Sequence, residues 1–281
     1  KGFVQLLQLV VMILGFLLFI AALLDQSPVI LLSGFGAMTA VLLLVFKDTI
    51  LSLVASVQLS AQDMVRVGDW IEVPQFGADG DVVDVELHTI KVQNWDKTIT
   101  TIPTHRLISD SFKNWRGMSN SGGRRIKRSL QIDTSSIRFL REAELERFKR
   151  FALLQGYIAG KQADLEEYNQ ALQGEFLEEV NTSVNLRRLT NIGTFRAYIY
   201  NYLKHHPKIH QNMTLLVRQL PAGPEGLPIE LYCFTNTTAW NDYEDIQGDI
   251  FDHLLAIVQE FGLQLYQQPA GSDFSRMIDK T

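Results

Sequence analysis

The chain is nearly devoid of cysteine, since Cys233 is the only one among its 281 residues. One cysteine excludes an internal disulfide framework and any zinc site built on cysteine ligands. A protein so poor in cysteine suits a reducing compartment. There we expect Cys233 to be a small, buried apolar residue.

The chain also lacks an excess of basic residues, because its formal net charge is −5. Phosphate binding needs a basic surface, so this charge argues against nucleic acid as a partner. Charge of either sign is scarce in residues 1–60, which are strongly apolar, whereas residues 61–281 carry nearly all of it. This division predicts a membrane portion followed by soluble domains.

No GxSxG, HExxH, P-loop or dinucleotide-binding motif is present. The acidic stretch 163–180 could in principle serve acid–base chemistry, but a solvated helix face is the interpretation we favour. His205, His206 and His210 could bind a metal, yet they lie where a helix is expected to end, and the helix dipole stabilises histidine there. Acidic residues between 69 and 86 alternate with apolar ones, as on the solvated face of strands. We therefore expect no enzyme, no catalytic residue, no cofactor and no metal site.

Two long apolar runs open the chain. Residues 3–24 are long enough to cross a bilayer, which takes about 20 residues. A polar turn at residues 25–28 follows, and residues 29–46 return, which predicts a helical hairpin. A signal peptide is the alternative, but a second apolar run would not follow it so soon. The few flanking positive charges place the turn outside and the C-terminal portion in the cytoplasm. Because the chain begins at Lys1 within an apolar run, we expect preceding sequence.

The stretch 31–59 changes character at Lys47 and Asp48. Before this pair, small residues are clustered and allow close helix packing in a membrane, and after it an amphipathic pattern suits an interface. We expect the pore helix to stop crossing the membrane at this joint and to turn sideways. The alternative is a single span that runs into a linker. The predicted pore-facing residues, which share one side of the helix, are Gly36, Ala37, Ala40 and Leu44. After the joint, the apolar stripe comprises Ile50, Leu53, Val54 and Val57.

Residues 65–115 predict a small barrel or curled sheet of four or five strands, because apolar and polar residues alternate between turn signals. Within this stretch the sequences VGDWIEV (67–73), GDVVDVELHT (80–89) and IPTHRLI (102–108) occur in order behind a helix bearing Gly and Ala. In these motifs the chain resembles the small-conductance mechanosensitive channel (MscS) family, over roughly residues 29–115. Within that family it most resembles the bacterial miniconductance members.

The resemblance implies a homoheptamer in the bacterial inner membrane, with the second span lining the pore and an Sm-like β domain in the cytoplasm. It implies a weakly selective channel of low conductance, opened by membrane tension during hypo-osmotic stress. The implied partners are membrane lipids, further copies of the chain, and permeating ions and small solutes. Three departures stand out: Asp48 where the family often has glycine, Thr104 where asparagine is common, and bulky leucines at residues 42–44. They imply a stiffer joint and a pore that is narrower or harder to open.

The C-terminal half predicts an α/β ferredoxin-like domain over residues 119–268, in the order β-α-β-β-α-β. We expect strands at 126–132, 214–220, 228–234 and 263–266, and helices at 137–154, 194–206 and 242–261. Asn241 with Glu244 predicts the cap of the last helix, and Gly262 its end. Residues 155–192 do not fit this order. We expect residues 155–160, with Gly156 and Gly160, to break the helix, and we interpret the whole segment as an acidic helical insertion on the outside of the domain. Residues 1–60 form the membrane portion, 61–118 the β domain and 269–281 a tail.

A run of basic residues at 124–128 opens the first strand of this half. Such a run can bind nucleic acid or anionic lipid, but a solvated strand end, or pairing with the acidic stretches, is favoured. The function that fits best is a mechanosensitive ion channel. The alternative is a membrane-anchored osmosensing or signalling component in which conduction is minor. A membrane-tethered enzyme fails for want of a catalytic constellation.

Overall fold

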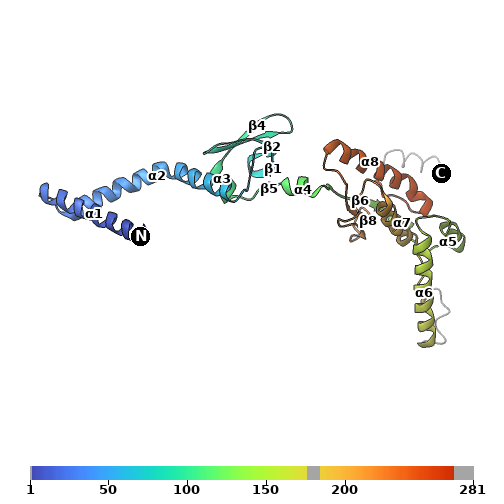
Figure 1. The fold of residues 1–281 in the computed structure, drawn as a ribbon. Coiled ribbons are helices and arrows are strands. Elements are labelled where there is room, and N and C mark those ends of the chain that lie inside the picture. The colour runs from blue at the N-terminus through green and yellow to red at the C-terminus, as the bar shows by residue number, and fades with distance from the viewer. Residues whose placement is uncertain (1, 176–183, 269–281) are drawn as a thin grey trace, which may run out of the picture. The chain divides into compact units, whose positions relative to one another are not determined.

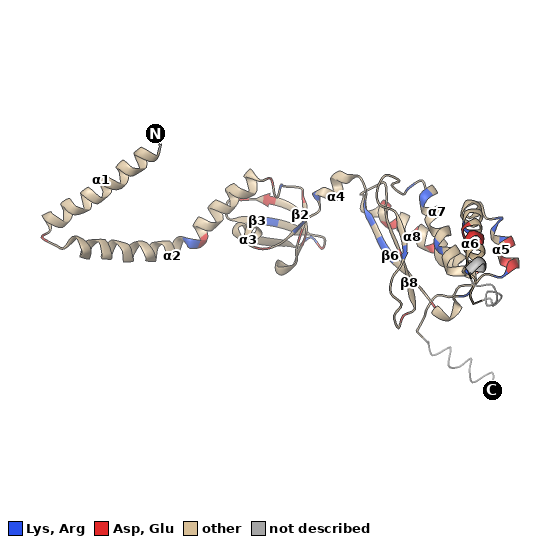
Figure 2. Ribbon diagram, turned by 90° about the horizontal axis from the view of Figure 1, so that it is seen from below, with Lys and Arg blue, Asp and Glu red and all other residues tan. Residues whose placement is uncertain are grey.

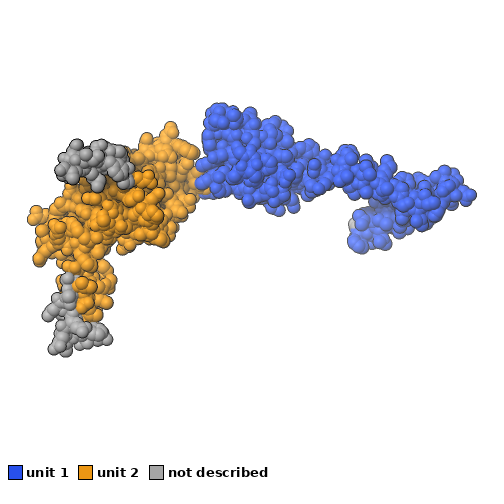
Figure 3. Space-filling model, turned by 180° about the vertical axis from the view of Figure 1, so that it is seen from behind, with its two compact units in different colours: residues 1–117 blue, residues 118–281 orange. Residues whose placement is uncertain are grey.

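The computed structural model describes residues 2–175 and 184–268. The chain divides into two compact units, residues 1–117 and residues 118–281, which Figure 3 colours separately. Residue Lys1, part of the expected insertion (176–183) and the expected tail (269–281) lie outside the described residues.

The first unit begins with a helical hairpin, as predicted. Helix α1 (Gly2–Leu23) and helix α2 (Pro28–Ala61) are joined by a short turn in which Asp25 adopts a positive φ of 51°. Proline suits the first position of α2, because the amide hydrogen that it lacks would have no partner in the helix. Both helices are long and apolar enough to cross a membrane, with mean hydropathies of 2.8 and 2.5.

A five-stranded antiparallel sheet follows the hairpin (Figure 1). Its strands lie in the order β4 (Ile99–Pro103), β3 (Thr89–Asn94), β2 (Ala78–Val85), β1 (Trp70–Val73) and β5 (Lys113–Asn114). Helix α3 (Thr104–Ser109) follows β4, and a 3₁₀ turn (Pro74–Phe76) joins β1 to β2. The inward residues of the alternating pattern, such as Ile71, Ile90 and Ile102, are fully buried. This is the β domain that the motifs predicted.

Gly80 shows why one motif position requires glycine. It lies opposite Asn94 in the β2–β3 ladder, where the two strands approach closely. A Cβ atom at this position would be 2.0 Å from the backbone oxygen of Gln93. Since backbone cannot move aside as a flexible side chain can, only glycine fits here without distorting the sheet.

The second unit contains a three-stranded antiparallel sheet in the order β6 (Arg125–Ile132), β8 (Leu227–Phe234) and β7 (Leu216–Gln219). The expected fourth strand is reduced to one antiparallel bridge from Leu265 to Ile132, on the free side of β6. Helices α7 (Asn191–His205) and α8 (Trp240–Ile257) pack into the same core. Together these elements confirm the predicted fold class, a helical hairpin followed by a β domain and an α/β domain.

The helix predicted over residues 137–154 is wrong. Instead a short helix α5 (Glu142–Phe148) is followed by α6 (Gln155–Glu175), which begins where a break was expected. Leu154 and Ile158 are buried in the core of the unit. Burial of these two side chains outweighs the low helix propensity of Gly156 and Gly160, which had suggested the break.

The predicted cap of the last helix is also wrong. Helix α8 begins at Trp240 with Ala239 as its N-cap, whereas Asn241 was the expected N-cap. Two tertiary contacts favour this earlier start: Arg124 lies over the Trp240 ring, 4.2 Å from its centroid, and Tyr243 donates a hydrogen bond to the Arg125 carbonyl at 3.0 Å. The predicted end is confirmed. Gly262, with φ of 64°, closes the 3₁₀ turn (Val258–Phe261) that continues α8.

The expected insertion is anchored in the core at both ends. In α6, Ile158 and Leu165 are buried, and at the far end Asn191 is fully buried at the start of α7. The segment that returns to α7 is held against α6 by Asn169, whose side chain exchanges two hydrogen bonds of 3.0 Å with the backbone of Arg187. The acidic side chains Asp164, Glu166 and Glu167 are exposed on α6 (Figure 2). That the insertion lies outside the cytoplasmic portion of the assembled protein stays a prediction.

Candidate pore helix and its attachment to the β domain

The N-terminal half of α2 exposes almost all of its apolar surface. No residue of its most apolar 18-residue window is buried, and Leu44 is 74% exposed. Exposed apolar area on this scale is unfavourable in water by about 25 cal/mol per Å². It must therefore be covered by lipid or by other chains.

The predicted pore-facing residues do share one side of this helix. At about 100° per residue, Gly36, Ala37, Ala40 and Leu44 fall within an arc of about 100°. All four are exposed, and a Cβ atom at Gly36 would meet nothing within 4 Å. This narrow, small-residue surface has no partner among the described residues of the chain. Its role as a pore lining stays a prediction.

Helix α2 is continuous through the predicted joint, from Pro28 past Lys47 and Asp48 to Ala61. That the helix stops crossing the membrane at this joint stays a prediction. Its axis nevertheless changes direction beside the blue and red pair on α2 in Figure 2, and these are the only charged residues of the helix.

The C-terminal half of α2 is attached to the β domain through one face. Ser52, Ala55 and Leu59 are buried there, and Leu59 belongs to the β-domain core. The Ser52 hydroxyl and His105 Nδ1 of α3 lie 3.1 Å apart in a hydrogen bond. The adjacent Thr104, which departs from the family motif, is fully buried, and its amide donates to the His88 carbonyl at 2.9 Å.

The predicted apolar stripe lies on the opposite side of this segment. Its residues are Ile50, Leu53, Val54 and Val57, which are 44–61% exposed. The β domain therefore does not cover the stripe. A helix with one face fixed to a soluble domain and an apolar face left open suits the membrane interface.

An ion pair with a buried carboxylate joins the segment between α2 and β1 to the start of helix α4 (Arg116–Ser121), which follows β5. The Asp69 side chain is 8% exposed and accepts hydrogen bonds from Arg116 Nε at 2.8 Å and from the Arg66 amide at 2.8 Å. Asn114 Nδ2 donates to Asp69 at 3.0 Å and to the Met64 carbonyl at 2.9 Å. Arg116 also reaches Asp63, in the turn that follows α2, at 3.1 Å.

These contacts shift the acidity of both carboxyl groups. Burial by itself would raise the pKa of Asp69, but the hydrogen bonds from Arg116, Arg66 and Asn114 outweigh it and hold that pKa below its usual value. The hydrogen bond from Arg66 is the main reason that the pKa of Asp63 is also lowered. In the sequence, Asp69 belongs to a motif and to the acidic positions expected on the solvated face of strands; the second expectation is wrong for Asp69, because its side chain is 8% exposed. The sequence did not identify Arg116 and Asn114, and their only signal was the segment KNWR (113–116), which begins five positions after the last motif ends.

The other charged clusters make structural contacts. Lys91 pairs with Asp84 at 3.0 Å and Glu86 at 2.6 Å, and Lys113 pairs with Glu72 at 2.9 Å. Among the described residues, no group of three or more His, Cys, Asp or Glu side chains could hold a metal ion. His205 donates from Nδ1 to the Asn201 carbonyl at 2.8 Å, within the last turns of α7.

Arginines of the basic run at the start of β6 lie over aromatic rings. The guanidinium groups stack as follows: Arg124 over Trp240 and Tyr243, Arg125 over Tyr232, and Arg128 over Phe251, at 4.1–5.6 Å from the ring centroids. Cation–π contacts of this kind contribute about 0.5–1 kcal/mol at exposed sites. The predicted pairing of this run with the acidic stretches stays a prediction.

Comparison with known proteins identifies the family. A model of the mechanosensitive ion channel beta-domain matches residues 48–117, and a model of the MscS C-terminal domain matches residues 180–265. Together they match more than half of the chain. The "Uncharacterized MscS family protein" of Helicobacter pylori is 22% identical over 271 residues, which is 92% of this chain and 38% of that protein. The "Low conductance mechanosensitive channel YnaI" of Escherichia coli is 23% identical over 216 residues, which is 77% of this chain and 47% of that protein. The chain thus spans less than half the length of these curated relatives.

Solved structures of the family share the fold. The cryo-EM structure of wild-type MSL1 from Arabidopsis thaliana gives a TM-score of 0.60 at 12% identity and covers 95% of this chain and 75% of that one. The crystal structure of Helicobacter pylori MscS in a closed state gives a TM-score of 0.54 at 11% identity, covering 95% and 81%. From its two matched domains and its named relatives, the chain belongs to the MscS family of mechanosensitive ion channels.

Proposed function

We propose that this chain is the pore-forming part of a homo-oligomeric channel opened by membrane tension. The observation that carries the proposal is helix α2. Its apolar half is fully exposed, and its C-terminal half is fixed to the β domain through Ser52, Ala55 and Leu59. One continuous element thereby links the membrane to the cytoplasmic portion, so movement of the pore helix and of the β domain are mechanically connected.

Tension opens such a pore without a ligand. Tension does work in proportion to the in-plane area that the protein gains on opening, so the wider state is favoured as tension rises. The closed pore needs only a constriction, and in the proposed register the bulkiest pore-facing side chain is Leu44. A ring of leucines narrow enough to exclude water blocks ions without any charged barrier.

The surface of α2 requires several copies around an axis. The small-residue side of one helix lets neighbouring backbones approach closely, which favours helix association in lipid. Head-to-tail contacts around an axis close into a ring. We propose a heptamer by analogy with the family. Placing Trp at Ala37 should disrupt the close packing, and mass analysis of the parent in detergent should show a heptamer; a monomer there would contradict the channel proposal.

The finer assignments follow from the family and from particular residues. The leucines at 42–44 support a narrow pore of low conductance, and the relative YnaI is named as a low-conductance channel. We propose weak ion selectivity, placement in the bacterial inner membrane with the C-terminal domains in the cytoplasm, and release of ions and small solutes during hypo-osmotic stress. Resemblance to the miniconductance members remains a prediction.

Patch-clamp recording on reconstituted protein tests the proposal. The expected result is a tension-dependent current of low unitary conductance, absent from vesicles without protein. A second candidate function, a membrane-anchored osmosensing component, is supported by the anchored insertion that begins with α6. An assembled, correctly folded protein that passes no current at any tension below bilayer rupture would favour this second function and contradict the first.

A further inference from the structure

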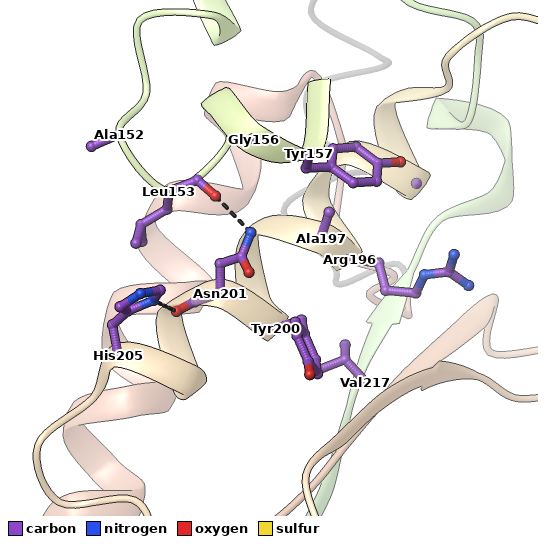
Figure 4. A pocket seen from close by; sticks show the side chains of 11 residues that line it. Ala152, Leu153, Gly156, Tyr157, Arg196, Ala197, Tyr200, Asn201, His205 and Val217 are labelled. Carbon is purple, nitrogen blue, oxygen red and sulfur yellow. Dashed lines mark hydrogen bonds between the residues drawn. The ribbon is translucent and has the colours of Figure 1, made fainter. Parts of the chain in front are cut away.

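The second unit contains an open groove that the channel function does not use. It has a volume of 890 Å³ and lies between the first turn of α6, one face of α7 and strand β7 (Figure 4). Cavities of about 300–1,000 Å³ are the size that holds small ligands. Four of the residues that line the groove are small, which leaves room in it: Ala152, Gly156, Gly193 and Ala197. A Cβ atom at Gly156 would meet nothing within 4 Å.

One end of the groove favours an anion. Arg196 is the only permanently charged residue that lines it, and no carboxylate lines it. Within the part of the chain that the structure describes, the Arg196 guanidinium has no ion-pair partner. Arg196 also acts electrostatically on the half-buried Tyr157, whose pKa is raised chiefly by burial and is lowered in part by this cation. A guanidinium beside a phenol offers several donors to a phosphate or carboxylate.

The other end of the groove offers acceptors. His205 Nδ1 donates to a carbonyl, so the neutral ring presents Nε2 as an acceptor. Asn201 donates through Nδ2 to the Leu153 carbonyl at 2.7 Å, which leaves its Oδ1 as a second acceptor. Figure 4 shows Arg196 and His205 toward opposite ends, with Ala197, Tyr200 and Asn201 between them. Arg196 and His205 are nine positions apart in α7, which is about 13 Å along the helix axis and about half a turn around it.

We infer that this groove binds a nucleoside monophosphate whose base carries an amino group. The phosphate pairs with Arg196, the base stacks along the Tyr157 and Tyr200 rings, and the amino group donates to Asn201 and His205. Aromatic stacking accepts any base, whereas the acceptors at the far end select one that can donate. The inference goes beyond the proposed channel function and does not depend on it, because binding is measured without current.

The test is isothermal titration of the whole chain in detergent with adenosine 5′-monophosphate. Saturable binding is expected. Adenosine lacks the phosphate, and Arg196→Met removes its partner, so each should weaken binding about 10- to 100-fold. Inosine 5′-monophosphate, which lacks the exocyclic amine, should bind more weakly than the adenosine nucleotide. Arg150→Met, at an exposed arginine outside the groove, should leave affinity unchanged.

A second variant separates loss of binding from loss of folding. Gly156→Leu fills the groove at a helical position with free space, so it should abolish binding while the Tm stays equal or rises. Absence of saturable binding at millimolar nucleotide would overturn the inference. So would full affinity in Arg196→Met, or equal affinity for adenosine and its monophosphate.

Discussion

The ion pair between Asp69 and Arg116 makes the sharpest prediction for the β domain. Asp69→Asn keeps the size of the side chain and removes its charge. Asp69 accepts hydrogen bonds from the Arg66 amide and from Asn114 Nδ2. The amide group of the new asparagine would bring its own donor close to these two donors. Arg116 would lose its buried partner and keep only Asp63.

Burial and hydrogen bonding of the pair determine how much Asp69→Asn destabilises the domain. Removing one partner of a fully buried pair costs about 3–5 kcal/mol. Because the Arg116 side chain is 22% exposed, water reaches it, and we expect a smaller loss, about 2 kcal/mol in the free energy of unfolding. In a domain of this size that loss lowers the Tm by roughly 10 °C.

The pH dependence gives an independent check. The folded-state pKa of Asp69 is depressed, so its stabilising contribution is present above the unfolded-state pKa, about 3.9, and is lost as pH falls through the folded pKa. The difference in stability between parent and Asp69→Asn should therefore be full at pH 7 and should shrink progressively below about pH 4.

Tryptophan fluorescence during denaturation follows this domain directly, because three of the four tryptophans lie in it. The Trp70 and Trp115 rings stack with centroids 4.6 Å apart, beside the ion pair. Asp81→Asn is the matched control, since Asp81 is exposed on the same sheet, and its effect should stay within about 0.5 kcal/mol. The reasoning is refuted if Asp69→Asn unfolds with the parent at pH 7, or if the difference between them is undiminished in acid.

Three further predictions concern the pore helix and the sheet. Leu44→Ser should hydrate the proposed constriction, so that the channel opens at lower membrane tension and cells expressing it grow more slowly. Leu42→Ser, about 200° away around α2, should change the opening tension less. Recordings in which neither variant shifts the opening tension would place the gate elsewhere. Asp48→Gly should loosen α2 at its bend and change the opening tension or inactivation in patch-clamp traces, and unchanged gating would mean that other residues set the bend. Gly80→Ala should destabilise the β domain by about 3 kcal/mol in denaturant unfolding, because its Cβ meets the Gln93 backbone. Its control Gly117→Ala, which meets nothing within 4 Å, should be close to neutral, and equal stability of the two variants would show that the sheet can relax.

The sequence by itself determined the hairpin, the β domain and the order of the α/β elements. Each depends on a local pattern: an apolar run as long as a bilayer is thick, the alternation of Ile71, Ile90 and their neighbours, or the 3.6-residue stripe of α7. The sequence motifs also indicated the family. Motif positions such as Gly80 are restricted to one residue type by the backbone geometry of the fold, so they are more specific than overall composition.

Only the tertiary structure decided which residues distant in the sequence are in contact. The break expected at Gly156 is overridden by burial of Leu154 and Ile158, and the start of α8 is moved by contacts with Arg124 and Arg125. The partnership of Asp69 with Arg116, 47 positions apart, carries no local signal, because distant hydrogen bonds leave no periodicity in a single sequence. The groove beside α7 likewise arises only when α6, α7 and β7 are packed together, since its lining residues come from segments as far apart in the chain as Ala152 and Val217.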